Sequence, residues 1–129
     1  MNNKTLGNNF ELELSEKLSE YGFWCHMLNA NKAGQPADII AVRNKIAYLI
    51  DAKVCSNRGF ALSRVEENQH NAMQLWWECG NGVGWFALKI KGEIWMMDID
   101  TVLEFSKHRS SIPYEDICNA AIPFERWIG

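Results

Sequence analysis

The sequence predicts an α/β protein with a mixed central β-sheet and a helix on each side of it. An amphipathic helical segment comes first, and three short apolar segments of strand length follow it. A second helical segment and a hairpin pattern come next. The expected order is therefore helix, three strands, helix, two strands, which is typical of a sheet packed between helices.

The first helix is predicted over residues 8–21. At about 100° per residue, one narrow face collects apolar side chains. These side chains are Phe10, Leu14, Leu18 and Tyr21. Glu11 falls at the margin of this face, away from the other glutamates of the helix. Gly22 ends the helix.

The strands are predicted from short apolar runs bounded by loop residues. They cover residues 23–28, 37–42, 46–54, 85–90 and 94–99. Side chains alternate between the two faces of a strand, so Asp51 and Lys53 lie on the same face of the third strand. The last two strands are joined by a short turn and form a hairpin.

The second helix is predicted to open at Ser63–Glu66, where the order Ser-x-x-Glu matches a capping box. Gln69 falls in the middle of its apolar stripe, which is an unusual place for an amide. After the hairpin, a short helix is expected near residues 101–107. Irregular or helical structure is expected around residues 114–121.

Length and composition are those of one ordinary globular domain of 129 residues, 47% of them hydrophobic and 22% charged. We expect a single domain over residues 1–129, with a core at about 7–100 and a C-terminal extension at 101–129. No apolar run approaches the roughly 18 residues of a membrane span, and the start has no signal-peptide pattern. Four cysteines without zinc-site spacing favour reduced thiols and a cytoplasmic protein.

Charge is unevenly distributed along the chain. The net charge is −3, yet residues 29–65 contain six basic and only two acidic side chains. A locally basic face on an acidic protein is compatible with phosphate binding, and ordinary solvated surface charge is the alternative. The candidate phosphate-binding residues of this face are Lys32, Arg43, Lys45, Arg58 and Arg64.

Polar side chains occur at four places where the pattern calls for apolar ones. Glu11 lies at a core margin, and Asp38 lies at the start of a strand. Asp51 and Lys53 lie within a strand, and Gln69 lies on a buried helix face. A buried carboxylate costs several kcal/mol unless it is paired or binds a metal. Taken singly, each case has an ordinary alternative. Glu11 would be a surface glutamate, and Asp38 would cap a strand edge. Asp51 and Lys53 would lie on an exposed edge strand or form an ion pair, and Gln69 would be a satisfied core amide.

Taken together, these side chains favour a catalytic site. Three carboxylates can hold a divalent cation, and hard oxygen ligands select Mg²⁺ or Mn²⁺. Lys53 shares a face with Asp51, so it can orient an attacking water or stabilise developing negative charge. These groups together are suited to phosphodiester hydrolysis.

Two stretches carry a family resemblance. Pro36-Ala37-Asp38, followed by Asp51-Ala52-Lys53, resembles the signature of PD-(D/E)XK nucleases, and the matching order of elements spans about residues 7–90. The spacing Gly7-x-x-Phe10-Glu11 and the stretch Glu67-Asn68-Gln69 resemble Holliday junction resolvases of the RecU type, including small phage-borne relatives.

The resemblance implies roles for individual residues. Glu11, Asp38 and Asp51 would be metal ligands or near-ligands, and the backbone carbonyl of Ala52 would complete the metal shell. Lys53 would be the catalytic lysine, and Gln69 would support the site. The resemblance further implies a homodimer that cuts four-way DNA junctions in a bacterial or phage-infected cell. A restriction-like or repair nuclease for linear, flapped or single-stranded DNA, or an inactive DNA-binding module, remains the alternative.

Overall fold

A computed structural model of the chain describes residues 3–28 and 37–129. The helices are α1 (Asn3–Glu20), α2 (Glu67–Glu78), α3 (Ile99–Ser106), α4 (Tyr114–Ala120) and α5 (Phe124–Trp127), with a 3-10 turn η1 (Leu62–Arg64). The strands are β1 (Trp24–Met27), β2 (Ile39–Arg43), β3 (Ile46–Val54), β4 (Gly59–Ala61), β5 (Trp85–Ile90), β6 (Glu93–Asp98), β7 (Ser111–Pro113) and β8 (Ile122–Pro123). The predicted α/β class with a mixed sheet is confirmed.

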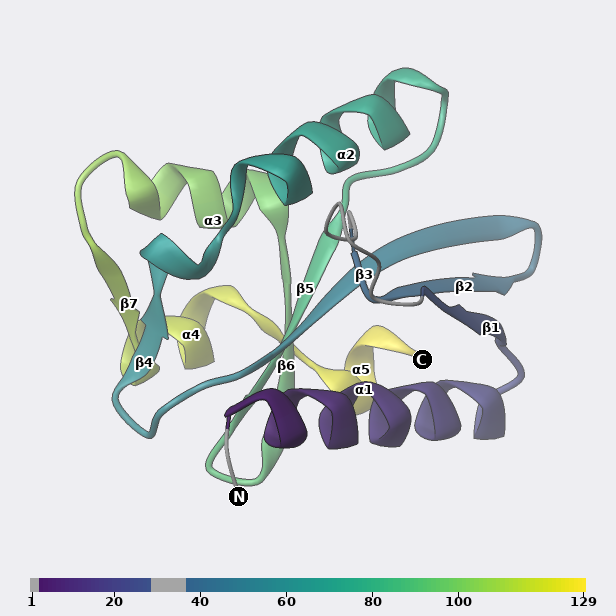
Figure 1. Cartoon of the computed structure of the whole chain (residues 1–129), viewed down its shortest axis with the longest axis horizontal. Coiled ribbons are helices and arrows are strands. Elements are labelled where there is room, and N and C mark those ends of the chain that lie inside the picture. The colour runs from purple at the N-terminus through teal and green to yellow at the C-terminus, as the bar shows by residue number, and fades with distance from the viewer. Residues whose placement is uncertain (1–2, 29–36) are drawn as a thin grey trace.

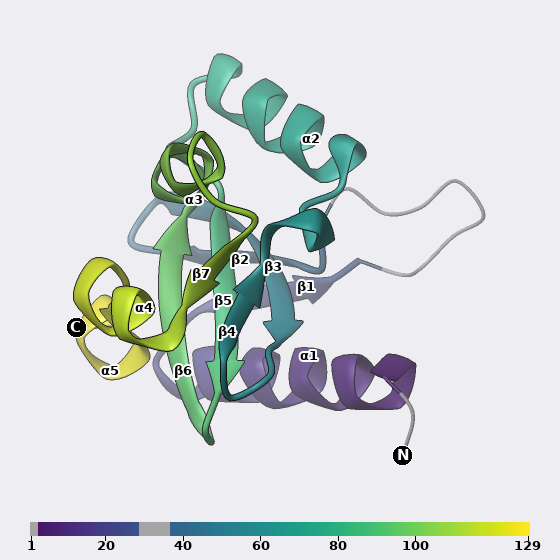
Figure 2. The ribbon, with the colours of Figure 1, turned by 90° about the vertical axis from the view of Figure 1, so that its left-hand side faces the viewer.

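Six strands form the main sheet in the order β1-β2-β3-β5-β6-β8 (Figure 1). The pairing of β3 with β5 is parallel, and the other pairings in this sheet are antiparallel. Helix α1 packs on one face of the sheet, whereas α2, α3 and the small β4–β7 sheet lie on the other side (Figure 2). The central strand β3 is therefore covered on both faces.

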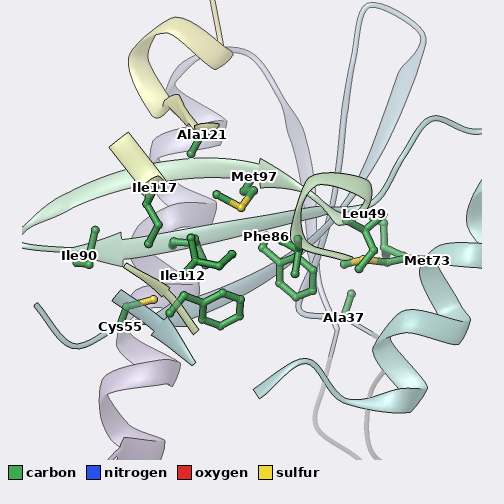
Figure 3. Close-up of a cluster of buried hydrophobic side chains, with 14 residues drawn as sticks. Ala37, Leu49, Cys55, Met73, Phe86, Ile90, Met97, Ile112, Ile117 and Ala121 are labelled. Carbon is green, nitrogen blue, oxygen red and sulfur yellow. The ribbon is translucent and has the colours of Figure 1, made fainter. Parts of the chain in front are cut away.

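Two apolar layers enclose the sheet because successive residues of β3 point to opposite faces. Ile50 packs in the layer beneath α1, together with the buried side chains Phe10 and Leu14. Leu49 packs in the other layer with Met73 of α2 and Phe86 of β5 (Figure 3). The side chains of residues 46–54 thus alternate between the two layers, as predicted.

The second helix begins later than its sequence pattern indicates. Ser63 lies in η1, and α2 starts at Glu67 with Glu66 as its N-cap residue. The amide oxygen of Gln69 accepts a hydrogen bond from the backbone N–H of Glu66 at 3.2 Å. The capping interaction is therefore shifted by three residues from Ser63–Glu66 to Glu66–Gln69.

The segment predicted as a C-terminal extension contributes strands to both sheets. Strand β7 pairs with β4, and β8 pairs with β6 at the edge of the main sheet. Gly59 permits the β4–β7 contact, because its φ is +147° and a Cβ atom there would lie 2.1 Å from the Ile112 carbonyl oxygen. Within residues 3–28 and 37–129, no helix is long and apolar enough to cross a membrane.

Candidate active site

Asp38 and Asp51 are brought together by the pairing of β2 with β3. The backbone N–H of Asp38 donates to the carbonyl of Ile50 at 3.0 Å, which fixes the entry into β2 beside Asp51. Asp38 Oδ2 in turn accepts a hydrogen bond from the backbone N–H of Ala52 at 2.7 Å. Both aspartates are buried, with 6% of Asp38 and 1% of Asp51 exposed.

The two oxygens of Asp51 have different partners. Oδ1 accepts a hydrogen bond from Gln69 Nε2 at 3.1 Å. Oδ2 lies 3.1 Å from Lys53 Nζ, close enough for an ion pair, but it accepts no aligned hydrogen bond from the described residues. We describe this contact as electrostatic, because its distance is short while its direction does not fit a hydrogen bond. Asp51 Oδ2 is thus the buried oxygen with capacity for a further ligand.

Glu11 joins the aspartates from α1. The pKa of Glu11 is raised to about 8, chiefly by burial, and then by a hydrogen bond to Asp38 and the charges of Asp38 and Asp51. The positive charge of Lys53 opposes this shift. The margin position predicted for Glu11 therefore places its carboxyl group within reach of both aspartates.

The pKa of Asp51 is likewise raised to about 8. Burial is the largest cause, and the charge of Asp38 adds to it. The charge of Lys53 lowers this pKa but does not offset the other effects. Without a cation, the site therefore retains protons on carboxyl groups at neutral pH, since three crowded carboxylates repel one another.

Gln69 is held in one orientation by α2. Its Oε1 accepts from the backbone N–H of Glu66, so its Nε2 is the atom presented to Asp51. A flip of this amide would place its oxygen against the Asp51 carboxylate. Gln69 is only 7% exposed, so little water could screen that repulsion. The buried amide expected from the helix pattern thus connects the start of α2 to Asp51.

The residues present fit a divalent cation of the Mg²⁺ type. Their side-chain donors are carboxylate oxygens, the surplus negative charge is buried, and Asp51 Oδ2 lacks a hydrogen-bond donor among the described residues. In residues 3–28 and 37–129, no three His, Cys, Asp or Glu side chains already form a group that could hold an ion. Magnesium requires fewer protein ligands, since it retains several waters and commonly takes one or two carboxylates plus phosphate oxygens.

The predicted basic residues lie at different ends of the β2–β3 hairpin. Arg43 lies at its far end from the aspartates, where its guanidinium donates to the carbonyls of Tyr21 and Ile128 and stacks over the Phe23 ring. Arg43 therefore fastens the C-terminal segment to the end of α1. Lys45 is exposed in the hairpin turn.

Arg58 and Arg64 lie beyond the other end of β3, on the same side as the aspartates. Both side chains are exposed, and Arg64 Nη1 donates to the carbonyl of Val54 at 2.6 Å. Lys32 lies outside the described residues. The structure thus brings only part of the predicted basic set near the acidic cluster.

A cleft of about 540 Å³ opens beside the acidic cluster and was not anticipated from the sequence. Its lining includes Ala52, Ser56 and Arg64 from β3 and the following segment, and Gly7 from α1. No local pattern marks it, because its walls come from segments far apart in the chain. Cys55 also lines it, and burial raises the pKa of that thiol to about 11, which favours an unreactive thiol.

Comparison with known proteins gives a consistent assignment. A family model of archaeal Holliday junction resolvases (Hjc) matches residues 2–129. The solved structure of the Holliday junction resolvase Hjc from Archaeoglobus fulgidus, an archaeal hyperthermophile, is similar with a TM-score of 0.72 and 16% identity. The similarity covers 95% of this chain and 100% of that chain, and at this identity it shows the fold alone. No curated protein matches this chain.

The predicted recognition of a resolvase is therefore confirmed at the level of the family, whereas its RecU-type and phage-borne details stay predictions. The matching family model spans nearly the whole chain and includes every residue of the acidic cluster. This chain belongs to the archaeal Holliday junction resolvase family and is a Holliday junction resolving nuclease.

Proposed function

We propose that this chain resolves four-way DNA junctions by metal-dependent phosphodiester hydrolysis at the cluster of Glu11, Asp38 and Asp51. The observation that carries this proposal is the convergence of three carboxyl groups and Lys53 at the ends of β2 and β3. A buried cluster with raised pKa values is unfavourable in the absence of a cation. Binding of Mg²⁺ or Mn²⁺ would relieve this repulsion.

Asp38 and Asp51 would hold the cation, with Glu11 as a ligand or near-ligand and the backbone carbonyl of Ala52 as a further oxygen ligand. The backbone N–H of Ala52 donates a hydrogen bond to Asp38 Oδ2 and so orients that carboxylate. Gln69 Nε2 donates to Asp51 Oδ1, which leaves Asp51 Oδ2 for the cation. When bound, the cation supplies charge neutralisation at the scissile phosphate and lowers the pKa of a water molecule.

Lys53 acts on the reacting phosphate. Its Nζ lies 3.1 Å from Asp51 Oδ2, and 11% of its side chain is exposed, so the ammonium group borders both the acidic cluster and solvent. In this position it can donate hydrogen bonds to the phosphate oxygens, on which negative charge accumulates as water attacks phosphorus and the opposite P–O bond breaks. It can also orient the attacking water.

A homodimer would supply the two active sites that paired cuts require. One copy of the chain carries one acidic cluster, and a two-fold axis would present two clusters to equivalent strands of a junction. We also propose that residues 1–129 act as one nuclease domain. A nuclease that acts on cellular DNA is expected in the cytoplasm, as the sequence also predicts.

The test is a cleavage assay on a labelled four-way junction and a linear duplex of matched sequence, with Mg²⁺ or Mn²⁺. We expect paired nicks in the junction only. We expect Asp51→Asn to abolish them, while the exposed-charge control Glu16→Gln retains them. Cutting of both substrates would contradict junction specificity. Absence of cutting on either substrate with both metals, or full activity of Asp51→Asn, would contradict the proposed catalytic site.

A further inference from the structure

The cleft lies next to the acidic cluster, although none of the cluster's side chains lines it. Its floor includes Ala52, which lies between Asp51 and Lys53, and its lining extends along the end of β3 to Val54 and Ser56. The opposite wall comes from the first part of α1, which runs beneath the end of β3 (Figure 2). At Gly7 in this wall, no heavy atom lies within 4 Å of where a Cβ atom would be, so the α1 backbone borders open space.

Arg64 is the one charged side chain among the described residues that line this cleft. Its Nη1 donates to the Val54 carbonyl at 2.6 Å, which restricts the guanidinium to the end of β3. No carboxylate in residues 5–28 and 37–129 pairs with it. Arginine has five N–H donors in a planar fork, and the Val54 carbonyl takes one of them. The others are available to a planar or tetrahedral anion.

Ser56 adds a neutral donor to the same cleft. Its Oγ accepts from the backbone N–H of Arg58 at 3.3 Å, which leaves its hydroxyl hydrogen free to donate. A tethered guanidinium beside a hydroxyl group, with no carboxylate in the described lining, is suited to a phosphate. The apolar contacts of Leu6 and Val54 are compatible with a sugar beside that phosphate.

Arg64 is anchored close to Lys53 along the chain, which indicates the part of the DNA that it would contact. The carbonyl that holds Arg64 belongs to the residue after Lys53, about 3.3 Å further along the strand. A phosphate held by Arg64 would therefore lie close to the phosphate that Lys53 contacts, and not at a remote part of the junction. We infer that this cleft binds the DNA phosphate next to the scissile one, with Arg64 as its charged ligand and Ser56 as a second donor. This inference rests on the proposed nuclease function of the neighbouring carboxylates.

The first test measures junction binding in EDTA, so that it does not depend on cleavage. We expect Arg64→Gln to weaken binding about tenfold at low salt. We also expect it to make the slope of log affinity against log salt shallower by about 0.9 for each bound subunit. The control Lys107→Gln removes an exposed charge just after α3 that is paired with Glu104, and its slope should equal that of the wild type. Equal slopes for Arg64→Gln and Lys107→Gln would overturn the inference.

The second test locates the phosphate. Cleavage products of the wild type identify the scissile bond, and an uncharged methylphosphonate then replaces either flanking phosphate. One replacement should weaken binding by the wild type and by Arg64→Lys, which keeps the charge, but should have no further effect on Arg64→Gln. Equal weakening in the wild type and Arg64→Gln would overturn the inference. A wild type that cuts no junction would refute the proposed function, and the salt slope would still decide whether Arg64 contacts a phosphate.

Discussion

The environment of Asp51 is unfavourable for a charged carboxylate in the metal-free protein. This side chain is buried, it lies beside Asp38, and its nearest cation, Lys53, does not offset the rise in its pKa to about 8. Gln69 contributes a hydrogen bond to one oxygen only. These contacts are explained by a role in which a cation completes the site, since a purely structural core position would be more stable with an apolar residue.

The raised pKa of Asp51 makes the metal-free protein less stable as pH rises. Between pH 4 and pH 8, the folded chain retains a proton that the unfolded chain has released. The contribution of Asp51 to the free energy of unfolding therefore falls through this range and levels off above pH 8. Asp51→Asn removes this titration, so in EDTA it should exceed the wild type in stability by on the order of 2 kcal/mol at pH 8 and by less at pH 5. Urea unfolding at both pH values measures the difference.

The test compares the stability difference between Asp51→Asn and the wild type at the two pH values. A stability difference that is the same at pH 5 and pH 8 would contradict a raised pKa at Asp51. Loss of folding in Asp51→Asn would instead indicate that the Gln69 and Lys53 contacts are needed for the structure itself.

Lys53 offers a second prediction at the level of one side chain. Lys53→Met keeps the length and the apolar stem but removes the ammonium group beside Asp51 Oδ2. We expect single-turnover cleavage to fall by about 10²–10³-fold, because a donor to the transition-state charge is lost. Junction binding in EDTA should change by no more than about threefold. Lys107→Met serves as the control, and near-normal cleavage by Lys53→Met would remove Lys53 from the mechanism.

At the level of elements, the position of α2 is set by contact with the segment before β5. Gly84 lies against Met73 of α2, and a Cβ atom on Gly84 would be 2.4 Å from Met73 Cγ and 2.8 Å from its Cβ. Met73 is one turn beyond Gln69 on the same buried face. Close packing at Gly84 therefore helps to hold Gln69 against Asp51.

Gly84→Ala should disturb this arrangement. The added methyl group must displace Met73, so we expect a loss of about 1–3 kcal/mol in the free energy of unfolding. We also expect several-fold slower cleavage, because movement of α2 separates Gln69 from Asp51. Gly82→Ala is a matched control, since no heavy atom lies within 4 Å of a Cβ there. Urea unfolding and single-turnover cleavage should distinguish the two variants. Equal behaviour would show that Met73 repacks without moving α2.

At the level of the whole molecule, the acidic cluster joins both apolar layers of the fold. Glu11 belongs to α1 on one side of the sheet, whereas Gln69 belongs to α2 on the other. Asp38 and Asp51 lie on the sheet between them. A ligand at this place binds only when the sheet and both helices are assembled, so its binding energy adds to global stability.

We therefore expect Mn²⁺ to raise the melting temperature. At a concentration about 100 times its dissociation constant, a ligand of the folded state adds about 2.7 kcal/mol, which corresponds to a rise of several degrees for a chain of this size. The rise should persist in Glu16→Gln and disappear in Asp38→Asn and Asp51→Asn. Calorimetry with and without Mn²⁺ measures it. An equal rise in all four proteins would place metal binding elsewhere on the chain.

The elements that the sequence predicted correctly depend on local periodicity. The apolar alternation of residues 46–54 corresponds to β3, and the hairpin of β5 and β6 differs from the prediction by one residue. Strands β4, β7 and β8 were not predicted, because such short segments are defined by distant partners. The start of α2 was misplaced because two overlapping capping patterns occur there, and tertiary contacts select the later one.

For the site, the sequence alone identified which residues were unusual. Carboxylates within apolar runs and an amide on a buried stripe are visible without coordinates, because burial penalises them wherever they lie. The sequence could not show that Arg43 is engaged by carbonyls at the far end of the hairpin, or that Arg64 borders a cleft beside Ala52. Those facts depend on strand pairing and helix packing, which bring together residues distant in the chain and so decide which charges act together.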